Sequence, residues 1–401
     1  MILPLRKMQA TNSLVLTQDF PPLPGGVSVY VENLYKNWTG RAIIVAPEST
    51  GPVKALFPPN IIVKRLPMDV TRGSLKSYLG RQIALYKASL SIIKKERIDV
   101  VQCAHMASGL AALMIKKIHS IPYVLYTYGS EITGQLGIIR YSLAKSVLKN
   151  AFCVVTMSEF TKRAIVRYGI DRKKVRLLVG VEVDRFSRIG DIEATKKKYD
   201  IKGNPIILTV ARLMEHKGID TVIKALPEML RKYPDMLYLV IGEGPYRGTL
   251  EKLSKRLSVE DHVKLLGNIP HDRLQDETEA FYSLCDLFLM ISRNINDIEA
   301  EGFGLVFLEA GLSKKAAIGG NSGGIGDAVI NGVTGKLVDP NDPEEVSKCA
   351  LSLLENQNIA KMMGENGYKR AVRFFDWGTN VRNWEKELNT LLSSKGKRIT
   401  T

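Results

Sequence analysis

The sequence predicts an α/β protein made of two doubly wound, parallel-sheet domains in series. Short apolar runs rich in β-branched residues alternate with stretches of helical period, and the whole alternation restarts near the middle of the chain. Strand–helix alternation of this kind favours a mostly parallel sheet with helices on both faces. The 401 residues also exceed the roughly 250 to 300 that a single hydrophobic core serves.

The first round of the alternation is expected to form a domain over residues 1–185. Stretches of helical period, such as 27–38 and 75–95, separate several of its predicted strands. Those strands are 13–17, 42–46, 61–66, 100–103, 123–126 and 152–156.

The second round is expected over residues 186–375, with helices that include 218–233 and 303–312. Ligands of such sheets bind beyond the carboxyl ends of the strands, at the point where the strand order reverses. Two facing halves are therefore expected to share a binding cleft. The predicted strands here are 206–210, 237–241, 263–266, 287–291, 317–318 and 335–338.

Composition narrows the class of protein. With 45% hydrophobic and 24% charged residues, the chain is typical of a globular protein. No apolar run reaches the roughly 18 to 20 residues of a membrane-spanning helix, and the first residues lack the pattern of a signal peptide. The four cysteines form no CxxC pair, so neither a zinc site nor a disulfide framework is indicated. A cytoplasmic protein is expected.

The net charge of +16 belongs to the first half of the chain. Residues 1–190 hold 28 Lys and Arg against 11 Asp and Glu, whereas the remainder is nearly neutral. This excess fits an ordinary solvated surface. It also fits contact with an anionic membrane or a phosphorylated acceptor. Nucleic acid is not an expected partner, because no nucleic-acid-binding motif accompanies the charge.

The first candidate site residues are Gly25 and Gly26, at the turn between the first strand and the first helix. Paired glycines let backbone N–H groups approach a ligand, and the helix N-terminus favours an anion. A purely structural turn explains them equally well. The GxGxxG dinucleotide fingerprint is absent.

Two cations, Arg212 and Lys217, follow the first strand of the second half. Arginine can hold phosphate oxygens in a bidentate fashion, and lysine supplies a point charge. The pair therefore suits a diphosphate at the ligand-binding edge of the sheet. The alternative is ordinary surface charge.

A third candidate is a pair of carboxylates, Glu301 and Glu309, in the segment EGFGLVFLE. Glu309 lies on an otherwise apolar helix, where a carboxylate needs a partner such as a ribose diol. Glu301 lies in the glycine loop at the helix start, beside N–H groups that can hold phosphate or sugar oxygens. A further glycine turn, Ser322-Gly323-Gly324, follows the next strand.

These motifs, in this order and spacing, resemble the retaining glycosyltransferases of the large group-4 family, which have the GT-B fold. The resemblance covers nearly the whole chain. It implies transfer of a hexosyl group, such as mannose, glucose or N-acetylglucosamine, from a UDP- or GDP-sugar. The acceptor would be a lipid-linked molecule, a polysaccharide or a small molecule. Among the members of this family, the phosphatidylinositol mannosyltransferases resemble the chain.

The resemblance also implies residue roles. Arg212 and Lys217 would bind the donor diphosphate, and Glu309 the ribose hydroxyls. Glu301 would bind the transferred sugar. Catalysis is therefore expected at Arg212, Lys217 and Glu301. The other expected donor-binding positions are Gly25 and Gly26 beside the phosphates, Gly242, Gly244 and Leu266 around the base, and Phe303, Gly304 and Leu305 at the helix start.

Family members are described as using front-face attack, in which the leaving phosphate helps to deprotonate the acceptor while the protein stabilises the diphosphate charge. No metal or cofactor is expected, since the sequence has no Asp-x-Asp motif and no clustered His or Cys ligands. The segment 376–401 resembles the family's last helix, which crosses back to the first domain.

The sequence departs from the family at Tyr128, in YGSE, where a histidine usually contacts the donor sugar. Tyrosine can donate a hydrogen bond but cannot carry a proton near neutral pH. The donor sugar is therefore left open. His105 and Glu131 are candidates on the acceptor side, although a structural role for His105 fits equally well.

Other functions compete with the transferase. A nucleotide-sugar 2-epimerase would share diphosphate binding, but the carboxylate pair with its glycine loop favours transfer. A phosphorylase would need a lysine context for pyridoxal phosphate. A two-domain binding protein would need no Arg/Lys pair. The insertion 294–300 and the basic first domain resemble members that act on lipid-linked acceptors, so a peripheral position at the inner membrane face is the working hypothesis.

Overall fold

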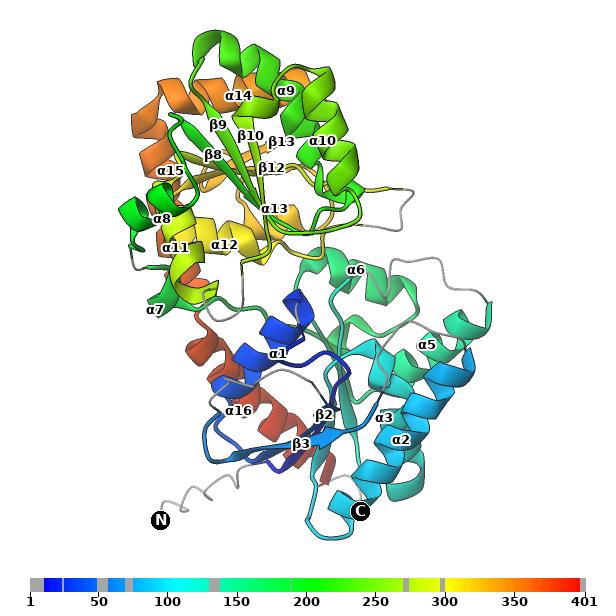
Figure 1. Cartoon of the computed structure of the whole chain (residues 1–401). Helices are drawn as coiled ribbons and strands as arrows, with labels where there is room; N and C mark the ends of the chain where they lie inside the picture. Colours follow the sequence, from blue (N-terminus) through cyan, green and yellow to red (C-terminus); the bar gives the residue numbers. More distant parts are fainter. Residues whose placement is uncertain are drawn as a thin grey trace, which may run out of the picture. The chain divides into compact units, whose positions relative to one another are not determined.

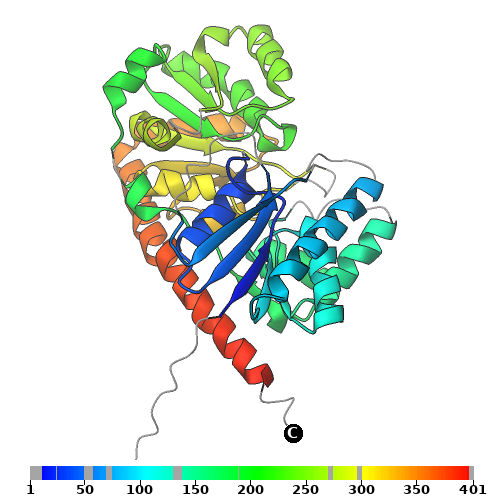
Figure 2. The ribbon, with the colours of Figure 1, turned by 60° about the horizontal axis from the view of Figure 1, so that its bottom comes forward.

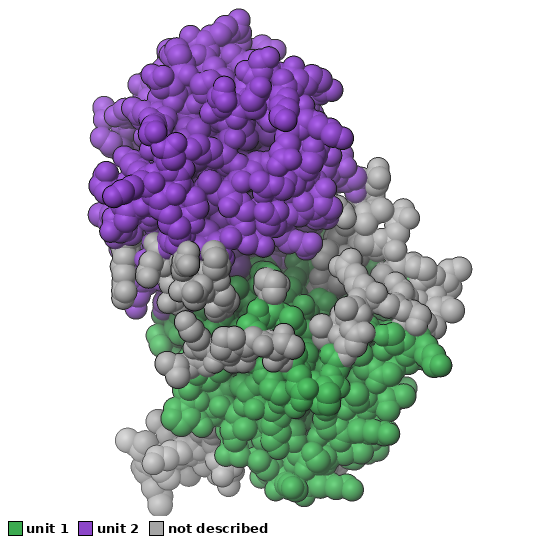
Figure 3. Space-filling view, in the orientation of Figure 1, with its two compact units in different colours: residues 1–157, 162–179, 377–401 green, residues 158–161, 180–376 purple. Residues whose placement is uncertain are grey.

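The computed structural model describes residues 11–23, 25–48, 57–68, 75–129, 138–187, 189–269, 274–295 and 300–396. The chain divides into two compact units (Figure 3). Unit 1 comprises residues 1–157, 162–179 and 377–401, and unit 2 comprises residues 158–161 and 180–376. Unit 2 thus begins a little before the predicted boundary at 185/186. Each unit contains one sheet.

Unit 1 contains a parallel sheet with the strand order β3-β2-β1-β4-β5-β6-β7. Its central strands are buried along their whole length, because they are apolar runs covered on both faces. The strands are β1 (Ser13–Leu16), β2 (Ala42–Pro47), β3 (Ile61–Leu66), β4 (Val100–Cys103), β5 (Tyr123–Tyr126), β6 (Cys153–Thr156) and β7 (Val175–Leu177).

Helices cover both faces of this sheet. In Figures 1 and 2, α2, α3 and α5 lie together on one side, and α1 and α16 run side by side on the other. The apolar residues of α2, α3, α5 and α6 form one core with the strands. The helices are α1 (Gly26–Lys36), α2 (Leu75–Ile93), α3 (Gly109–His119), α5 (Ile138–Asn150), α6 (Glu159–Arg167) and α16 (Trp377–Gly396), with short 3-10 turns η1 (Met106–Ser108) and η2 (Arg172–Lys174).

Strand β7 was not predicted from the sequence. Its three residues contain Arg176 and end in the exposed Leu177, so they form no continuous apolar run. The reason is its place at the edge of the sheet, where only β6 pairs with it. An edge strand needs less apolar surface than a central one. The six predicted strands of the first half were found within one residue of the expected bounds.

Unit 2 repeats the architecture with the parallel order β10-β9-β8-β11-β12-β13. Its strands are β8 (Ile206–Val210), β9 (Leu237–Ile241), β10 (Val263–Gly267), β11 (Leu287–Met290), β12 (Ala316–Gly320) and β13 (Gly335–Val338). Its helices are α7 (Val183–Phe186), α8 (Ile192–Lys198), α9 (Ile219–Lys232), α10 (Arg247–Arg256), α11 (Leu274–Leu284), α12 (Leu305–Leu312), α13 (Ile325–Ala328), α14 (Pro343–Glu355) and α15 (Gln357–Phe374), with η3 (Glu215–Lys217) and η4 (Glu260–His262).

The strand order of unit 2 reverses between β8 and β11, which pair in parallel through Ile207 with Leu287 and Leu208 with Phe288. The chain runs from β8 outward to β9 and β10, then returns to β11 on the other side of β8. The loops that leave the carboxyl ends of β8 and β11 are therefore neighbours. This switch point is where sheets of this type bind ligands.

Within the described part of the chain, no helix combines the length and apolar character needed to span a bilayer. The four cysteines are free thiols, as the sequence predicted. Burial raises the pKa of the Cys103, Cys153 and Cys285 thiols to about 12 in each case. These three thiols are therefore protonated and unreactive near neutral pH.

Candidate active site

The loops after β8 and β11 bring Lys217 and Glu301 together. Lys217 closes the η3 turn, and its Nζ donates a hydrogen bond to Oε2 of Glu301. The side chains are only 17% and 15% exposed. Burial would raise the pKa of Glu301, but the charge and hydrogen bond of Lys217, with His216 nearby, lower that pKa below its usual value. Glu301 is therefore a carboxylate at neutral pH.

Arg212 lies in the same loop as Lys217, directly after β8, and its side chain is exposed. No ion pair or hydrogen bond joins this guanidinium to any residue that the structure describes. The two predicted cations therefore have different environments. Lys217 is paired with a carboxylate, and Arg212 faces solvent. A free guanidinium at a strand end can bind an anion without first breaking a contact.

The loop after β9 packs on the loop that carries Arg212, and the end of β10 contacts the loop after β9. Gly242 has φ 138°, and a Cβ there would lie 2.0 Å from the carbonyl oxygen of Ala211. A Cβ on Gly244 would lie 2.3 Å from the carbonyl oxygen of Leu213. The Gly242 N–H donates to the carbonyl of Gly267, 2.8 Å away. Close backbone packing therefore brings Gly242 and Gly244 to the loop of Arg212, and Leu266 lies on β10, whose end is bonded to Gly242.

The glycine loop before α12 is held by the glycine turn after β12. The Gly324 N–H donates to the carbonyl of Glu301 at 2.8 Å. A Cβ on Gly324 would lie 2.1 Å from the carbonyl oxygen of Gly302, and one on Gly323, whose φ is +57°, would lie 2.5 Å from that of Glu301. Only glycines allow this approach. The structure therefore joins the two glycine motifs of the sequence into one element.

Helix α12 begins later than predicted, at Leu305 rather than at Phe303. Gly304 is its N-cap with φ 90°, a left-handed conformation that cannot be part of the helix. Phe303 is buried against Phe375, and Leu305 is partly buried. The Phe307 N–H donates to the carbonyl of Gly304 at 3.0 Å, which leaves the N–H groups of Leu305 and Val306 available to an anion or a sugar oxygen.

Glu309 projects from the middle of α12 and is partly buried. Its Oε2 accepts a 2.7 Å hydrogen bond from the phenol of Tyr282. Burial raises the pKa of Glu309, and the hydrogen bond from Tyr282 and the charge of Arg185 only partly counteract this effect. The protein partner of this carboxylate is thus a tyrosine, which the sequence analysis did not identify.

In unit 1, Gly25 and Gly26 are exposed at the start of α1. Gly25 caps the helix with φ 141°, and its carbonyl accepts from the N–H of Val29. No atom of the described chain lies within 4 Å of a Cβ built on either glycine. The backbone at this helix N-terminus is therefore open to a ligand, as the prediction requires.

Tyr128 and His105 form a pair beyond the ends of β5 and β4. Their rings are stacked, with centroids 6.0 Å apart and an interplanar angle of 17°. The Tyr128 phenol donates to the carbonyl of Ala104 at 2.7 Å, so its hydrogen is engaged within unit 1. The Nδ1 of His105 accepts from the N–H of Ala107 at 3.0 Å and lies 3.9 Å from the carboxylate of Asp19. Glu131 lies outside the described residues.

Arg293 was also missed by the sequence analysis. Its guanidinium lies 2.9 Å from the buried carboxylate of Asp220 and donates to the hydroxyl of Thr221 at 3.1 Å, while its N–H donates to the carbonyl of His216. The bond to His216 ties Arg293 to the loop that carries Lys217, and the contacts with Asp220 and Thr221 tie it to α9. A buried aspartate in an amphipathic helix was the only available signal.

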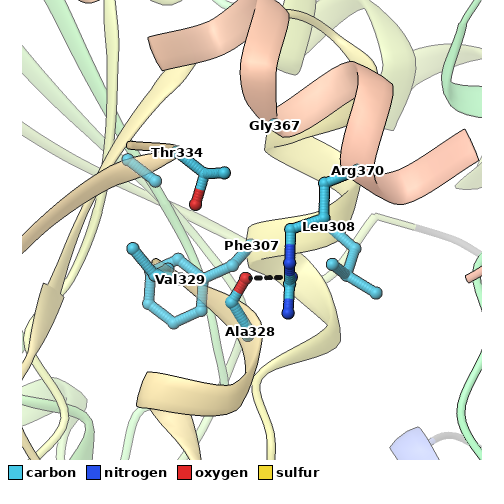
Figure 4. A pocket seen from close by; sticks show the side chains of 8 residues that line it. Phe307, Leu308, Ala328, Val329, Thr334, Gly367 and Arg370 are labelled. Atoms are coloured by element: carbon cyan, nitrogen blue, oxygen red, sulfur yellow. Dashed lines mark hydrogen bonds between the residues drawn. The ribbon is translucent and has the colours of Figure 1, made fainter. Parts of the chain in front are cut away.

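A small cavity lies between α12, α13 and α15 (Figure 4). Arg370 donates there to the carbonyls of Asp327 and Ala328, at 2.6 and 2.7 Å, and so satisfies the end of α13. This contact is structural, because it supports the helix that follows Gly324. The cavity is lined by Phe307, Leu308, Ala317, Ala328, Val329, Thr334, Gly367 and Arg370.

Known proteins match the chain in both halves. The family profile described as "Glycosyltransferase Family 4" matches residues 24–179, and the one described as "Glycosyl transferases group 1" matches residues 191–370. A relative from Mycobacterium tuberculosis, "GDP-mannose-dependent alpha-(1-6)-phosphatidylinositol monomannoside mannosyltransferase", is 30% identical over 382 residues, covering 91% of this chain and 95% of the relative. This chain belongs to the family 4 glycosyltransferases. The predicted family is confirmed.

The glycosyltransferase is also 26% identical to "N-acetyl-alpha-D-glucosaminyl L-malate synthase" of Bacillus anthracis, over 79% of this chain and 81% of the relative. Its fold matches HepE of Anabaena, solved in complex with UDP and glucose, with a TM-score of 0.79 at 20% identity, covering 95% of this chain and 100% of HepE. The predicted GT-B fold of two Rossmann-like domains is confirmed. The two relatives favour a glycosyltransferase over an epimerase or a binding protein.

Proposed function

We propose that this glycosyltransferase is a retaining, metal-independent mannosyltransferase that takes mannose from GDP-mannose and transfers it to a lipid-linked acceptor. The observation that carries the proposal is the ion pair between Lys217 and Glu301. Lys217 lies in the same loop as the exposed Arg212. Both cations lie at the switch point of unit 2. The choice of GDP-mannose and of a lipid-linked acceptor comes from the name of the relative from Mycobacterium tuberculosis.

In the proposed complex, Arg212 and Lys217 bind the diphosphate and neutralise the charge that develops as the bond to mannose breaks. The N–H groups at the start of α12 assist, as helix N-termini do with phosphates. These groups are the protein's own source of positive charge, which is the basis for proposing metal independence. In this proposal Glu301, which is hydrogen-bonded to Lys217, accepts hydrogen bonds from mannose hydroxyls.

The remaining contacts follow from the same arrangement. Glu309 accepts from the ribose hydroxyls, and the loops of Gly242, Gly244 and Leu266 bind the base. Unit 1 supplies the acceptor contacts, since Gly25 leaves backbone open there and His105 presents its ring. Because Nδ1 of His105 accepts from Ala107, a neutral ring carries its hydrogen on Nε2 and can donate to a hydroxyl.

A donor screen tests the proposal. The purified protein is incubated with GDP-mannose, UDP-glucose, UDP-N-acetylglucosamine or ADP-glucose, with and without a lipid extract, and the released nucleotide is measured. Release of GDP that depends on the extract is expected, and it should persist in EDTA. Nucleotide release from the UDP-sugars but not from GDP-mannose would contradict GDP-mannose as the donor. A loss of nucleotide release in EDTA that Mg²⁺ reverses would contradict metal independence.

We also propose that unit 1 binds the anionic inner face of the cytoplasmic membrane. The exposed residues of α2 include Lys76, Leu79, Ile83 and Lys87, which share one helix face because they recur every three or four residues. Leu79 and Ile83 are 39% and 47% exposed. Apolar side chains flanked by lysines are typical of helices that lie in a membrane interface.

Co-sedimentation tests this localisation. The protein should pellet with vesicles that contain phosphatidylserine at low salt and return to the supernatant at high salt, because screening weakens the lysine contacts. The double variant Leu79→Ser/Ile83→Ser should pellet less at low salt. Equal recovery in the supernatant at both salt concentrations would contradict the proposal.

A further inference from the structure

The carboxylate of Glu309 is held on one side only. Its Oε2 accepts from the Tyr282 phenol at 2.7 Å. No hydrogen bond from a residue in the described ranges reaches Oε1. Glu309 is partly buried, and its Oε1 is not among the fully buried polar atoms that lack a partner, so solvent reaches this oxygen. The carboxylate thus has one engaged oxygen and one oxygen free to accept from a ligand.

Tyr282 is built into the core. It is fully buried on α11, its ring meets Phe186 edge to face at 5.7 Å, and it packs against Phe288 at 5.6 Å. These contacts fix the ring, and therefore the direction of the phenol. Burial and the nearby charge of Glu309 raise the pKa of Tyr282 well above its usual value, so the phenol keeps its hydrogen and always donates.

An arginine network lies behind the pair. Arg185 on α7 is 3.3 Å from the carboxylates of both Glu182 and Glu279, and its guanidinium lies over the Phe186 ring at 4.5 Å. Arg185 favours the charged form of Glu309, whereas Glu182 opposes it. The hydrogen bond from Tyr282 and the charge of Arg185 therefore both stabilise the charged form of Glu309.

We propose that Tyr282 is a positioning residue for the nucleotide ribose: its phenol holds Oε2 of Glu309 and leaves Oε1 aimed to accept from the ribose hydroxyls. This inference rests on the proposed function, which assigns the ribose to Glu309. The phenol does not touch the nucleotide. It fixes a flexible side chain in one rotamer before binding, so that less conformational entropy is lost when the ribose arrives.

The test compares GDP with 2′,3′-dideoxy-GDP, which lacks both hydroxyls. Tyr282→Phe should bind GDP about tenfold more weakly than the wild type and bind dideoxy-GDP within about twofold of it. In transfer assays the KM for GDP-mannose should rise while kcat stays nearly constant. In a Glu309→Ala background, adding Tyr282→Phe should have no further effect on GDP affinity.

Tyr238→Phe is the matched control. Tyr238 is also fully buried in unit 2, and its phenol is hydrogen-bonded to the hydroxyl of Thr209 at 2.8 Å, on the central strands. Its loss should change stability without altering the ratio of GDP to dideoxy-GDP affinity. If Tyr282→Phe lowers the affinity for GDP and for dideoxy-GDP by the same factor, Tyr282 has only a structural role and the inference is wrong.

The wild-type protein supplies a second measurement that does not depend on a folded variant. GDP should bind at least about fivefold more tightly than dideoxy-GDP. Equal affinities would overturn the inference while leaving a GDP site intact. Failure to bind GDP at all would instead contradict the proposed function, so the two failures are distinguishable.

Discussion

At the scale of single residues, the site depends on charges that hold each other in place. Glu301 is largely buried, which by itself favours its neutral form, and the ion pair with Lys217 reverses this preference. In the absence of a ligand, the pair keeps a lysine beside the glycine loop. Arg212 has no such partner among the described residues and is the more exposed cation. The proposed function therefore has a diphosphate bind Arg212 directly and share Lys217 with Glu301.

The Lys217–Glu301 pair should make stability depend on pH. Because the pKa of Glu301 is lowered in the folded protein, its contribution is complete above about pH 4.3, the usual value for glutamate, and is lost as the pH falls through the folded value. Glu301→Gln should be less stable than the wild type by about 1 kcal/mol at pH 6. That difference, measured by urea unfolding, should shrink toward zero at pH 3.

Glu365→Gln is the control for this prediction. Glu365 pairs with Lys314 at 2.9 Å, but the two side chains are 45% and 54% exposed. Exposed pairs contribute little to stability. The control should therefore match the wild type at both pH values, and a Glu301→Gln deficit that is equal at pH 6 and pH 3 would contradict the account.

Single residues differed in how well the sequence revealed them. Arg212, Lys217 and Glu301 could be proposed from the sequence because each is a charged residue that follows the end of a predicted strand. Tyr282 was not proposed, because a tyrosine next to a phenylalanine on the apolar face of a helix is usually a core residue, and only the three-dimensional structure places its phenol on Glu309. Arg293 was missed for a similar reason: its buried partner, Asp220, is distant in sequence.

At the scale of elements, the glycine turn after β12 is the part that fixes the loop of Glu301. Gly324 contacts this loop through backbone atoms alone, with an N–H bond to Glu301 and no room for a side chain beside Gly302. The position of Glu301 is therefore set by an element about twenty residues further along the chain.

Gly324→Ala should displace this loop. The new Cβ would lie 2.1 Å from the carbonyl oxygen of Gly302, so backbone must shift. We expect a loss of stability of about 1–3 kcal/mol and a transfer rate at least about tenfold lower. Gly326→Ala is the control, because Gly326 is exposed and nothing lies within 4 Å of its Cβ. Wild-type activity in Gly324→Ala would contradict the role of the turn.

Most elements were predictable, since buried parallel strands are continuous apolar runs and the helices between them have a clear period. The exceptions have physical causes. Strand β7 contains an arginine at the sheet edge, and α12 starts late because Gly304 adopts a left-handed conformation. The periodicity of apolar residues indicates which residues are buried. It predicts neither an edge strand with a polar residue nor the backbone conformation that delays the start of a helix.

At the scale of the whole molecule, the last helix belongs to unit 1, although it follows unit 2 in the chain. Helix α16 is attached by Glu385, which is 7% exposed and accepts hydrogen bonds from the N–H groups of Thr39 and Gly40 and from the Thr39 hydroxyl. The N-terminal unit is therefore completed by the end of the chain.

Glu385→Ala should destabilise unit 1 by about 2–3 kcal/mol, because two backbone N–H groups lose their acceptor. Hydrogen exchange should accelerate in peptides of unit 1 and stay unchanged in the sheet of unit 2. Glu387→Ala is the control, since Glu387 is 44% exposed in its pair with Arg176. Uniform acceleration in both units would contradict this prediction.

The sequence predicted this long-range organisation only through the family resemblance. A glutamate on an amphipathic C-terminal helix is normally solvated, and nothing local distinguishes Glu385 from Glu387. Local periodicity predicts elements, whereas the pairing of the first and last segments depends on contacts across more than 300 residues of chain. Such contacts leave no pattern in a single sequence.

The most direct test is transfer of radiolabelled mannose from GDP-mannose to a lipid extract by wild-type, Lys217→Ala and Lys252→Ala proteins. Lys252 is an exposed lysine on α10 of the same unit. The account predicts transfer by the wild type and by Lys252→Ala, and a turnover at least about tenfold lower in a folded Lys217→Ala protein. Near-wild-type turnover in Lys217→Ala, or no transfer by any of the three, would contradict it.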